Sequence, residues 1–280
     1  MTTKLGYDST HPISLDALRN NGASAVGRYI GNFRKAASFS EIHNYLNGGF
    51  GVWLIWESTA DRALKGYAAG AEDAKRANTA AALLGAPTDV FICWTVDTDA
   101  NPKDVLSYAR GWANNTHHPA AVYGSAGVID ICIEKQLVRT GWQTNARGWD
   151  RPRRYSTHAT MWQHLSTSPV GVGSVDPNNF IDSCPMIWKL HNKPDMTGPQ
   201  WPGTLARGDR SYGVAQWAFI LHSCGYRGFI WTGEGADSFQ VGKINATRRF
   251  QKNHGIPVTG KVDKVTWDKG VALAMKKGSE

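Results

Sequence analysis

Two aspartates, Asp97 and Asp99, stand one residue apart where the apolar run "FICWTV" ends. If residues 90–97 form a strand, side chains alternate between its two faces, so both carboxyl groups start toward the same side. Two like charges in one small space cost free energy unless one is protonated, and that arrangement suits acid/base catalysis. A structural alternative also fits. In "DANPKD", Asn101 could be a helix N-cap with Pro102 at the first helical position, and Asp99 would then be only a turn residue.

Elements able to position such a pair recur through residues 1–185. Helix signals lie between several strand-like apolar runs, such as Ser38 and Glu41 at capping-box spacing. Strands that alternate with helices predict a parallel sheet, and eight strands are the number that closes a (β/α)8 TIM-like barrel. The strand-like runs cover residues 4–8, 25–31, 51–57, 90–97, 120–125, 140–146, 159–165 and 173–180.

Acids gather at the ends of these runs. Asp8 closes the first run, Glu57 the third, Asp97 and Asp99 follow the fourth, and Asp176 lies within the eighth. Active sites of such barrels lie at the carboxyl ends of the strands, so five acids at one mouth predict a carboxylate-based catalytic site. We expect neither a metal nor a cofactor, because the sequence has no H-E-x-x-H motif and its four cysteines form no C-x-x-C pair.

The remaining chain reads as a linker and a second domain. Residues 186–204 hold three prolines and two glycines, which predicts a linker, and residues 205–280 carry three helix-like segments, which predict a small all-α domain. Residues 1–185 hold 17 basic and 16 acidic residues, whereas residues 186–280 hold 14 and 7. The basic C-terminal part favours a polyanionic partner such as an anionic wall polymer. We expect no nucleic acid, because the densest basic cluster is short, and no membrane insertion.

The second domain carries a recognisable pattern. It resembles the three-helix peptidoglycan-binding domain of many cell-wall hydrolases, which implies peptidoglycan as a partner. The final stretch "GIPVTGKVDKVTW" matches the end of that pattern. The other matching residues are Leu205, Gly208, Asp209, Val214, Gln216, Gly225, Tyr226, Ala246, Phe250 and Gln251.

The first domain resembles the glycoside-hydrolase-like barrels related to family 25 lysozymes. The stretches "LGYDST", "GRYIG", "VDTDA", "VYGS", "MWQH" and "VDPNNF" occur in the order of that family. Its members carry an acid on the first strand, Asp-x-Glu after the fourth, Trp-Gln on the seventh and Asp-x-Asn on the eighth. The matching residues here are Asp8, Asp97, Trp162, Gln163, Asp176 and Asn178.

One position departs from the family pattern. The glutamate of Asp-x-Glu is Asp99 here, whose side chain is one methylene shorter. A displacement of ~1 Å can lower a rate about a hundredfold, so Glu57 becomes a rival for the role of proton donor.

The resemblance implies a peptidoglycan hydrolase of the lysozyme type, an N-acetylmuramidase. One protonated carboxyl, Asp99 or Glu57, would donate to the leaving oxygen, and Asp97 or Asp8 would be its charged partner. Asp176 would hold or polarise its neighbours. Side chains expected to contact sugar are Tyr29, Tyr123, Trp162, Gln163 and Asn178. Two alternatives stay open: a wall-binding protein whose barrel has lost catalysis, and an amidase or peptidase acting on the stem peptide.

The pairing of a barrel with a wall-binding domain resembles a bacteriophage endolysin, an antimicrobial enzyme of cytolysis. The N-terminus "MTTKLGYDSTHP" lacks a basic region followed by an apolar core. We therefore expect a monomer made in the host cytoplasm without a signal peptide, which reaches the cell wall after holin-mediated release.

Overall fold

The computed structural model describes residues 2–31, 34–146, 148–149, 154–164, 168–169, 174–189, 198–231 and 235–276. The chain divides into two compact units. The first comprises residues 1–37, 41–78 and 87–194, and the second comprises residues 38–40, 79–86 and 195–280. Within the predicted linker, residues 190–197 lie outside the described residues.

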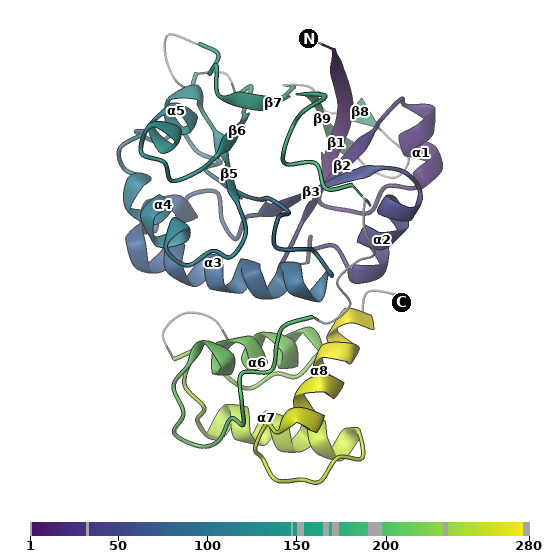
Figure 1. Ribbon diagram of the computed structural model, residues 1–280, viewed down its shortest axis with the longest axis vertical. Coiled ribbons are helices and arrows are strands. Elements are labelled where there is room, and N and C mark those ends of the chain that lie inside the picture. Colours follow the sequence, from purple (N-terminus) through teal and green to yellow (C-terminus); the bar gives the residue numbers. More distant parts are fainter. Residues whose placement is uncertain are drawn as a thin grey trace. The chain divides into compact units, whose positions relative to one another are not determined.

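The first unit is built around a closed barrel (Figure 1). Seven strands run parallel, and each pairs with the next one along the chain. An eighth barrel strand, β9 (Ser174–Ile181), pairs with both β7 and β1 and closes the ring. The predicted α/β barrel is therefore confirmed. The seven parallel strands are β1 (Thr3–Ser9), β2 (Ala25–Tyr29), β3 (Gly51–Trp56), β4 (Ile92–Thr95), β5 (Ala120–Gly124), β6 (Thr140–Gln143) and β7 (Ala159–Gln163).

The direction of β9 differs from the all-parallel sheet that the sequence predicted. β9 is antiparallel to both of its barrel neighbours. Only ten residues separate β7 from β9, whereas a parallel connection needs a dozen or more. A two-residue strand, β8 (Ser168–Pro169), pairs with β9 inside this connection. Because β9 runs backward, its N-terminal half lies beside the C-terminal end of β1, and Asp176 therefore reaches the mouth of the barrel.

A tryptophan fills the interior beneath this mouth. Trp53 on β3 is fully buried, and its indole lies against Gly6 and Gly27 on the two preceding strands. A Cβ atom at Gly27 would lie 2.2 Å from Cε2 of Trp53, far inside van der Waals contact. Trp53 also meets Trp142 edge to face, with ring centroids 5.9 Å apart. The two glycines therefore leave the space that this large side chain occupies.

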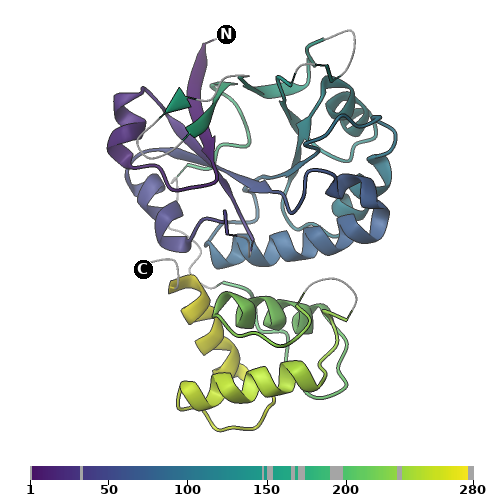
Figure 2. The same ribbon diagram turned by 180° about the vertical axis from the view of Figure 1, so that it is seen from behind.

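Five helices follow strands β1 to β5 and lie outside the sheet (Figure 2). They are α1 (Leu15–Asn20), α2 (Phe39–Asn47), α3 (Gly66–Leu83), α4 (Leu106–Ala113) and α5 (Ala126–Glu134), and the 3-10 turn η1 (Arg62–Lys65) precedes α3. The helix start predicted at Asn101 is wrong, because α4 begins only at Leu106. Asn101 instead caps a turn, in which its Oδ1 accepts a hydrogen bond from the backbone N–H of Lys103 at 3.0 Å.

The second unit contains three helices, α6 (Tyr212–Ser223), α7 (Val241–Asn253) and α8 (Lys264–Lys276), as the sequence predicted. One aromatic side chain from each helix forms its core. The ring centroid of Trp217 lies 5.4 Å from that of Phe250 and 6.0 Å from that of Trp267. Within the described part of the chain, no helix is long and apolar enough to cross a membrane.

Gln251 explains why the pattern of the second domain pairs Phe-Gln with a distant Thr-Gly and Thr-Trp. Its side chain is fully buried. Oε1 accepts from the N–H of Gly260 at 2.9 Å, while Nε2 donates to the carbonyl of Lys261 at 2.8 Å and lies 3.2 Å from Oγ1 of Thr266. The aromatic residues of the pattern, such as Phe250 and Trp267, therefore lie in the core. The polar residue Gln251 forms hydrogen bonds that hold the loop between α7 and α8 in place.

Candidate active site

Two aspartates face each other at the mouth of the barrel. Asp8 on β1 stands directly opposite Asp176 on β9 in the antiparallel register. Gln163, the last residue of β7, lies between them: its Nε2 is 3.3 Å from Oδ2 of Asp8 and 3.3 Å from Oδ2 of Asp176. Asp8 is buried and Asp176 is half-buried. Three residues that the sequence singled out from three distant segments therefore form one cluster.

Two neighbouring side chains fix the orientation of the amides that contact Asp8. The amide of Asn178 donates to Oδ2 of Asp8 at 2.8 Å, while its Oδ1 accepts from the indole N–H of Trp142 at 2.8 Å. Tyr123 likewise donates its hydroxyl to Oε1 of Gln163 at 2.6 Å. Because each amide oxygen is occupied by a donor, each NH2 group must face the carboxylates. Sequence reasoning missed Trp142, which resembles any other core aromatic in a strand.

The environment of Asp8 favours its protonated form. Burial raises the pKa of Asp8 from 3.8 to about 7. The hydrogen bonds from Asn178 and Gln163 act against this rise, and the charges of Asp176 and Glu57 add to it. Near neutral pH, Asp8 therefore exchanges between acid and carboxylate.

Glu57, at the end of the third strand, is paired with a lysine. It follows β3 directly, and its Oε1 lies 2.5 Å from Nζ of Lys35. Lys35 also lies over the ring of Tyr29, with Nζ 4.0 Å from the ring centroid. Both partners of the pair are mostly shielded, with side-chain exposures of 24% for Lys35 and 15% for Glu57. A lone lysine in a loop gave no signal in the sequence, so Lys35 is the main residue that sequence reasoning missed.

Asp97 belongs to the same group of charges but keeps an exposed side chain. Its backbone N–H donates to the carbonyl of Ala60 at 3.1 Å, which anchors the loop after β4. Partial desolvation raises the pKa of Asp97, and the charges of Glu57 and Asp176 raise it further, while Lys35 lowers it. An accessible carboxyl with a raised pKa can hold a proton and deliver it to a bound molecule.

Asp99 stands apart from this group. β4 ends at Thr95, so the strand alternation that would direct Asp97 and Asp99 to the same side does not reach either residue. Asp99 is exposed and forms no hydrogen bond or ion pair with the described residues. The expected pair of adjacent acids is therefore replaced by acids from different strands.

The aromatic residues expected to contact sugar occupy three different positions. The Tyr29 ring lies under Lys35, and Tyr123 is buried with its hydroxyl engaged by Gln163. Trp162 lies between Met161, a residue of the interior core, and Gln163. Because side chains alternate along a strand, Trp162 points to the outer face of the barrel.

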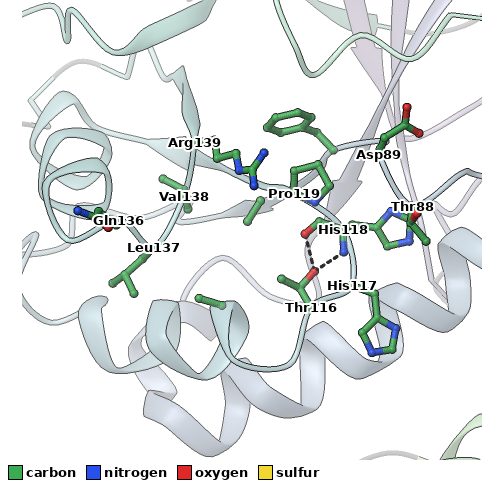
Figure 3. Close-up of a pocket in the computed structure, with 13 residues that line it drawn as sticks. Thr88, Asp89, Thr116, His117, His118, Pro119, Gln136, Leu137, Val138 and Arg139 are labelled. Atoms are coloured by element: carbon green, nitrogen blue, oxygen red, sulfur yellow. Dashed lines mark hydrogen bonds between the residues drawn. The ribbon is translucent and has the colours of Figure 1, made fainter.

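A pocket of about 460 Å³ lies at the other end of the barrel (Figure 3). Its lining includes Phe91, Ala120 and Arg139, which stand at the amino ends of β4, β5 and β6. Inside it, the Thr116 hydroxyl donates to the carbonyl of His118 at 2.9 Å. The acids listed above lie at the carboxyl ends of the strands, so this pocket is separate from them.

Comparisons with known families agree with both units. Residues 16–180 match the model of the Rv2525c-like, glycoside hydrolase-like domain, and residues 220–269 match a putative peptidoglycan binding domain. No curated protein matches the chain.

Among solved structures, the barrel is similar to the Tat-secreted protein Rv2525c of Mycobacterium tuberculosis, crystallised with HEPES. The identity is 25% and the TM-score 0.58, over 66% of this chain and 98% of the other. An uncharacterized protein of B. stearothermophilus shares the fold, at 18% identity and a TM-score of 0.53, over 66% of this chain and 100% of that one.

The first of these neighbours corrects one expectation from the sequence. We expected a protein that accumulates in the cytoplasm without an export signal and leaves only after holin-mediated release. That prediction is wrong, because the similar Rv2525c is a Tat-secreted protein, which points to export. The family match extends over more than half of the chain. The chain therefore belongs to the Rv2525c-like, glycoside hydrolase-like domain family.

Proposed function

We propose that this protein is a peptidoglycan hydrolase that cleaves glycosidic bonds of the glycan strand, with the specificity of an N-acetylmuramidase. A glycoside-hydrolase-like barrel joined to a putative peptidoglycan-binding domain supports this substrate. The observation that carries the proposal is the contrast between Glu57, which is paired with Lys35, and Asp97, whose pKa is raised. Carboxyl groups held in different protonation states are what glycoside hydrolysis requires.

We assign the proton donor to Asp97 and the charged partner to Glu57. In the first step, the Asp97 carboxyl gives its proton to the glycosidic oxygen while the bond from that oxygen to the anomeric carbon breaks. The Glu57 carboxylate stabilises the positive charge that develops on the sugar. Water then adds to the anomeric carbon and gives its proton to the Asp97 carboxylate, which restores the acid and leaves a new reducing end. This assignment reverses the expected roles, since the resemblance suggested Asp99 or Glu57 as the acid and Asp97 or Asp8 as its charged partner.

The remaining polar residues act on these two groups. Lys35 orients the Glu57 carboxylate through their ion pair. Asp176, joined to Asp8 through Gln163, adds negative charge at the mouth, and this charge raises the pKa of Asp97. Asn178 donates to Asp8, and Tyr123 donates to Gln163, so these two residues fix the positions of the Asp8 and Gln163 side chains. No step in this scheme requires a metal or cofactor.

Reducing-end release from purified peptidoglycan tests the proposal. The intact protein should release reducing ends, and Glu57→Gln and Asp97→Asn should each lower the rate by about a thousandfold. Asp99→Asn is the matched control and should stay within about threefold of the native rate, because Asp99 contacts none of the other acids.

Two other outcomes would identify a different function. Release of new amino groups instead of reducing ends would indicate an amidase or peptidase. Retained wall binding with no release of either kind would indicate a binding protein, a function favoured by the missing glutamate at position 99.

A further inference from the structure

The helical unit contains a pocket of its own, of about 410 Å³. It lies between the loop that precedes α7 and the first turn of that helix. Cationic and apolar side chains share its lining: Arg210 and Lys243 on one hand, Phe229 and Ile230 on the other. No aspartate or glutamate is among its described lining residues.

Lys243 is a buried cation that pairs with no carboxylate among the described residues. Its side chain is almost inaccessible, at 3% exposure. Its ammonium donates to the carbonyl of Gly235 at 2.9 Å and to that of Ser238 at 2.8 Å, and an ammonium has three donors. Burial lowers the pKa of Lys243 to about 8, and the charge of Asp237 acts against this. The side chain is therefore still mainly charged at neutral pH, and within the part of the chain that the structure describes its ammonium contacts only these two carbonyl groups.

Arg210 adds a second positive charge beside it. Its backbone forms a bridge to Ser238, one of the two residues that accept from Lys243. The guanidinium is exposed and forms no hydrogen bond or ion pair with the residues that the structure describes. The N-terminus of α7 lies at the same place, and Gln240 gives it no side-chain cap. All three features favour an anion in this pocket.

The apolar part of the lining narrows the kind of anion. Ile230 is 57% exposed, and Phe229 beside it is half-buried. Such a surface gains free energy by covering a methyl or methylene group. A phosphodiester polymer presents charge on a polar backbone, whereas the end of an alanine peptide presents a carboxylate next to a methyl group.

We propose that this pocket binds the free carboxyl end of a short wall peptide, with the carboxylate at Arg210 and Lys243 and the apolar flank against Phe229 and Ile230. The inference rests on the wall-binding part of the proposed function. It does not rest on the glycosidase activity of the barrel, so either could fail without the other.

Calorimetric titration of the full-length protein tests this inference. The probe is an acetylated Lys-D-Ala-D-Ala peptide with a free carboxyl end, compared with the same peptide ending in an amide. The free acid should bind at least about tenfold more tightly, since the amide lacks the charge. Arg210→Met should weaken binding of the free acid by about tenfold, while Lys252→Met, which removes an exposed cation from the same helical unit, should leave it unchanged.

A second variant and a competitor complete the test. Lys243→Met should also weaken binding, provided that its circular dichroism and melting curve show a folded unit. Equal affinity for acid and amide would overturn the proposal, as would equal losses in Arg210→Met and Lys252→Met. Displacement of the peptide by a glycerol-phosphate oligomer at lower concentration than by the free acid would show a phosphodiester site instead. Reducing-end release, measured on the same samples, reports separately on the barrel.

Discussion

The mouth of the barrel and the pocket of the helical unit handle buried charge in opposite ways. The mouth holds Asp8, Glu57 and Asp97, and Lys35 pairs with Glu57. Burial raises the pKa values of Asp8 and Asp97, and the charges of the neighbouring acids raise them further. The helical pocket holds two cations among carbonyl groups and apolar side chains. Acids with raised pKa values can exchange protons near neutral pH, which suits catalysis, whereas cations that remain mainly charged at neutral pH suit the binding of an anion.

Among the changes that test this comparison, the largest expected effect comes from removing Lys35, the cation paired with Glu57. In Lys35→Met, Glu57 loses its ion pair, and the pKa of Asp97 rises because Lys35 no longer lowers it. The basic limb of the pH profile of kcat/KM, which follows the loss of the Asp97 proton, should therefore move to higher pH. The rate should also fall by about tenfold, because the Glu57 carboxylate loses the ammonium that orients it.

Two companion variants separate this role from a purely structural one. Lys35→Arg keeps the charge and should restore the native profile in large part. Lys65→Met removes a lysine from the exposed pair with Asp61 and should change neither limb. A Lys35→Met variant with lower activity but an unshifted profile would refute the assigned role.

The second effect concerns stability and comes from Asp8. Its pKa of about 7 in the folded state lies above the ordinary value of 3.8, so the folded state binds more protons between these limits. Stability from this group is complete at low pH and is lost as the pH rises through 7. The new side chain in Asp8→Asn cannot ionise. As the pH rises from 4.5 to 8, the free energy of unfolding of this variant should therefore increase by on the order of 2 kcal/mol relative to that of the native chain.

Urea unfolding at the two pH values measures this difference. Exposed Asp16, at the start of α1, supplies the control, because Asp16→Asn should leave the pH dependence of stability unchanged. A gain for Asp8→Asn that is equal at both pH values would show that Asp8 does not titrate in this range.

A third, smaller effect is that wall adsorption by the helical unit should depend more strongly on salt concentration than hydrolysis by the barrel. Exposed cations of the helical unit, such as Arg210, attract an anionic wall over distances that salt screens. Adsorption of the full-length protein to purified walls should fall about fivefold between 50 mM and 500 mM salt. Hydrolysis of short soluble glycan fragments should change by less than half of that factor. Equal salt dependence in both assays would contradict the division of charge between the regions.

Local patterns in the sequence predicted much of the fold. Apolar runs of strand length gave all eight barrel strands, and Ser38 marks the start of α2. The direction of β9 was missed because a run of alternating residues reads the same in either direction, and only the short connection from β7 decides it.

The candidate site was predictable only in part, for a related reason. Strand ends identified Asp8, Glu57 and Asp97, because position in a barrel follows from position in a strand. Lys35 and Trp142 act through contacts with residues far away in sequence, and neither has a spacing that signals it. Trp162 shows the opposite error, since the resemblance to the lysozymes suggested a role that strand alternation argues against.

The smallest expected effect tests that alternation with two adjacent residues of β7. Gln163 contacts Asp8 and Asp176, whereas Trp162 points to the outer face of the barrel. Gln163→Leu should therefore lower reducing-end release by about fourfold, because two carboxylates lose a shared donor. Trp162→Ala should change release by about twofold or less, even if it lowers the melting temperature. A larger loss in Trp162→Ala than in Gln163→Leu, with both variants folded, would mean that the indole contacts the sugar and that β7 presents its other face to the substrate.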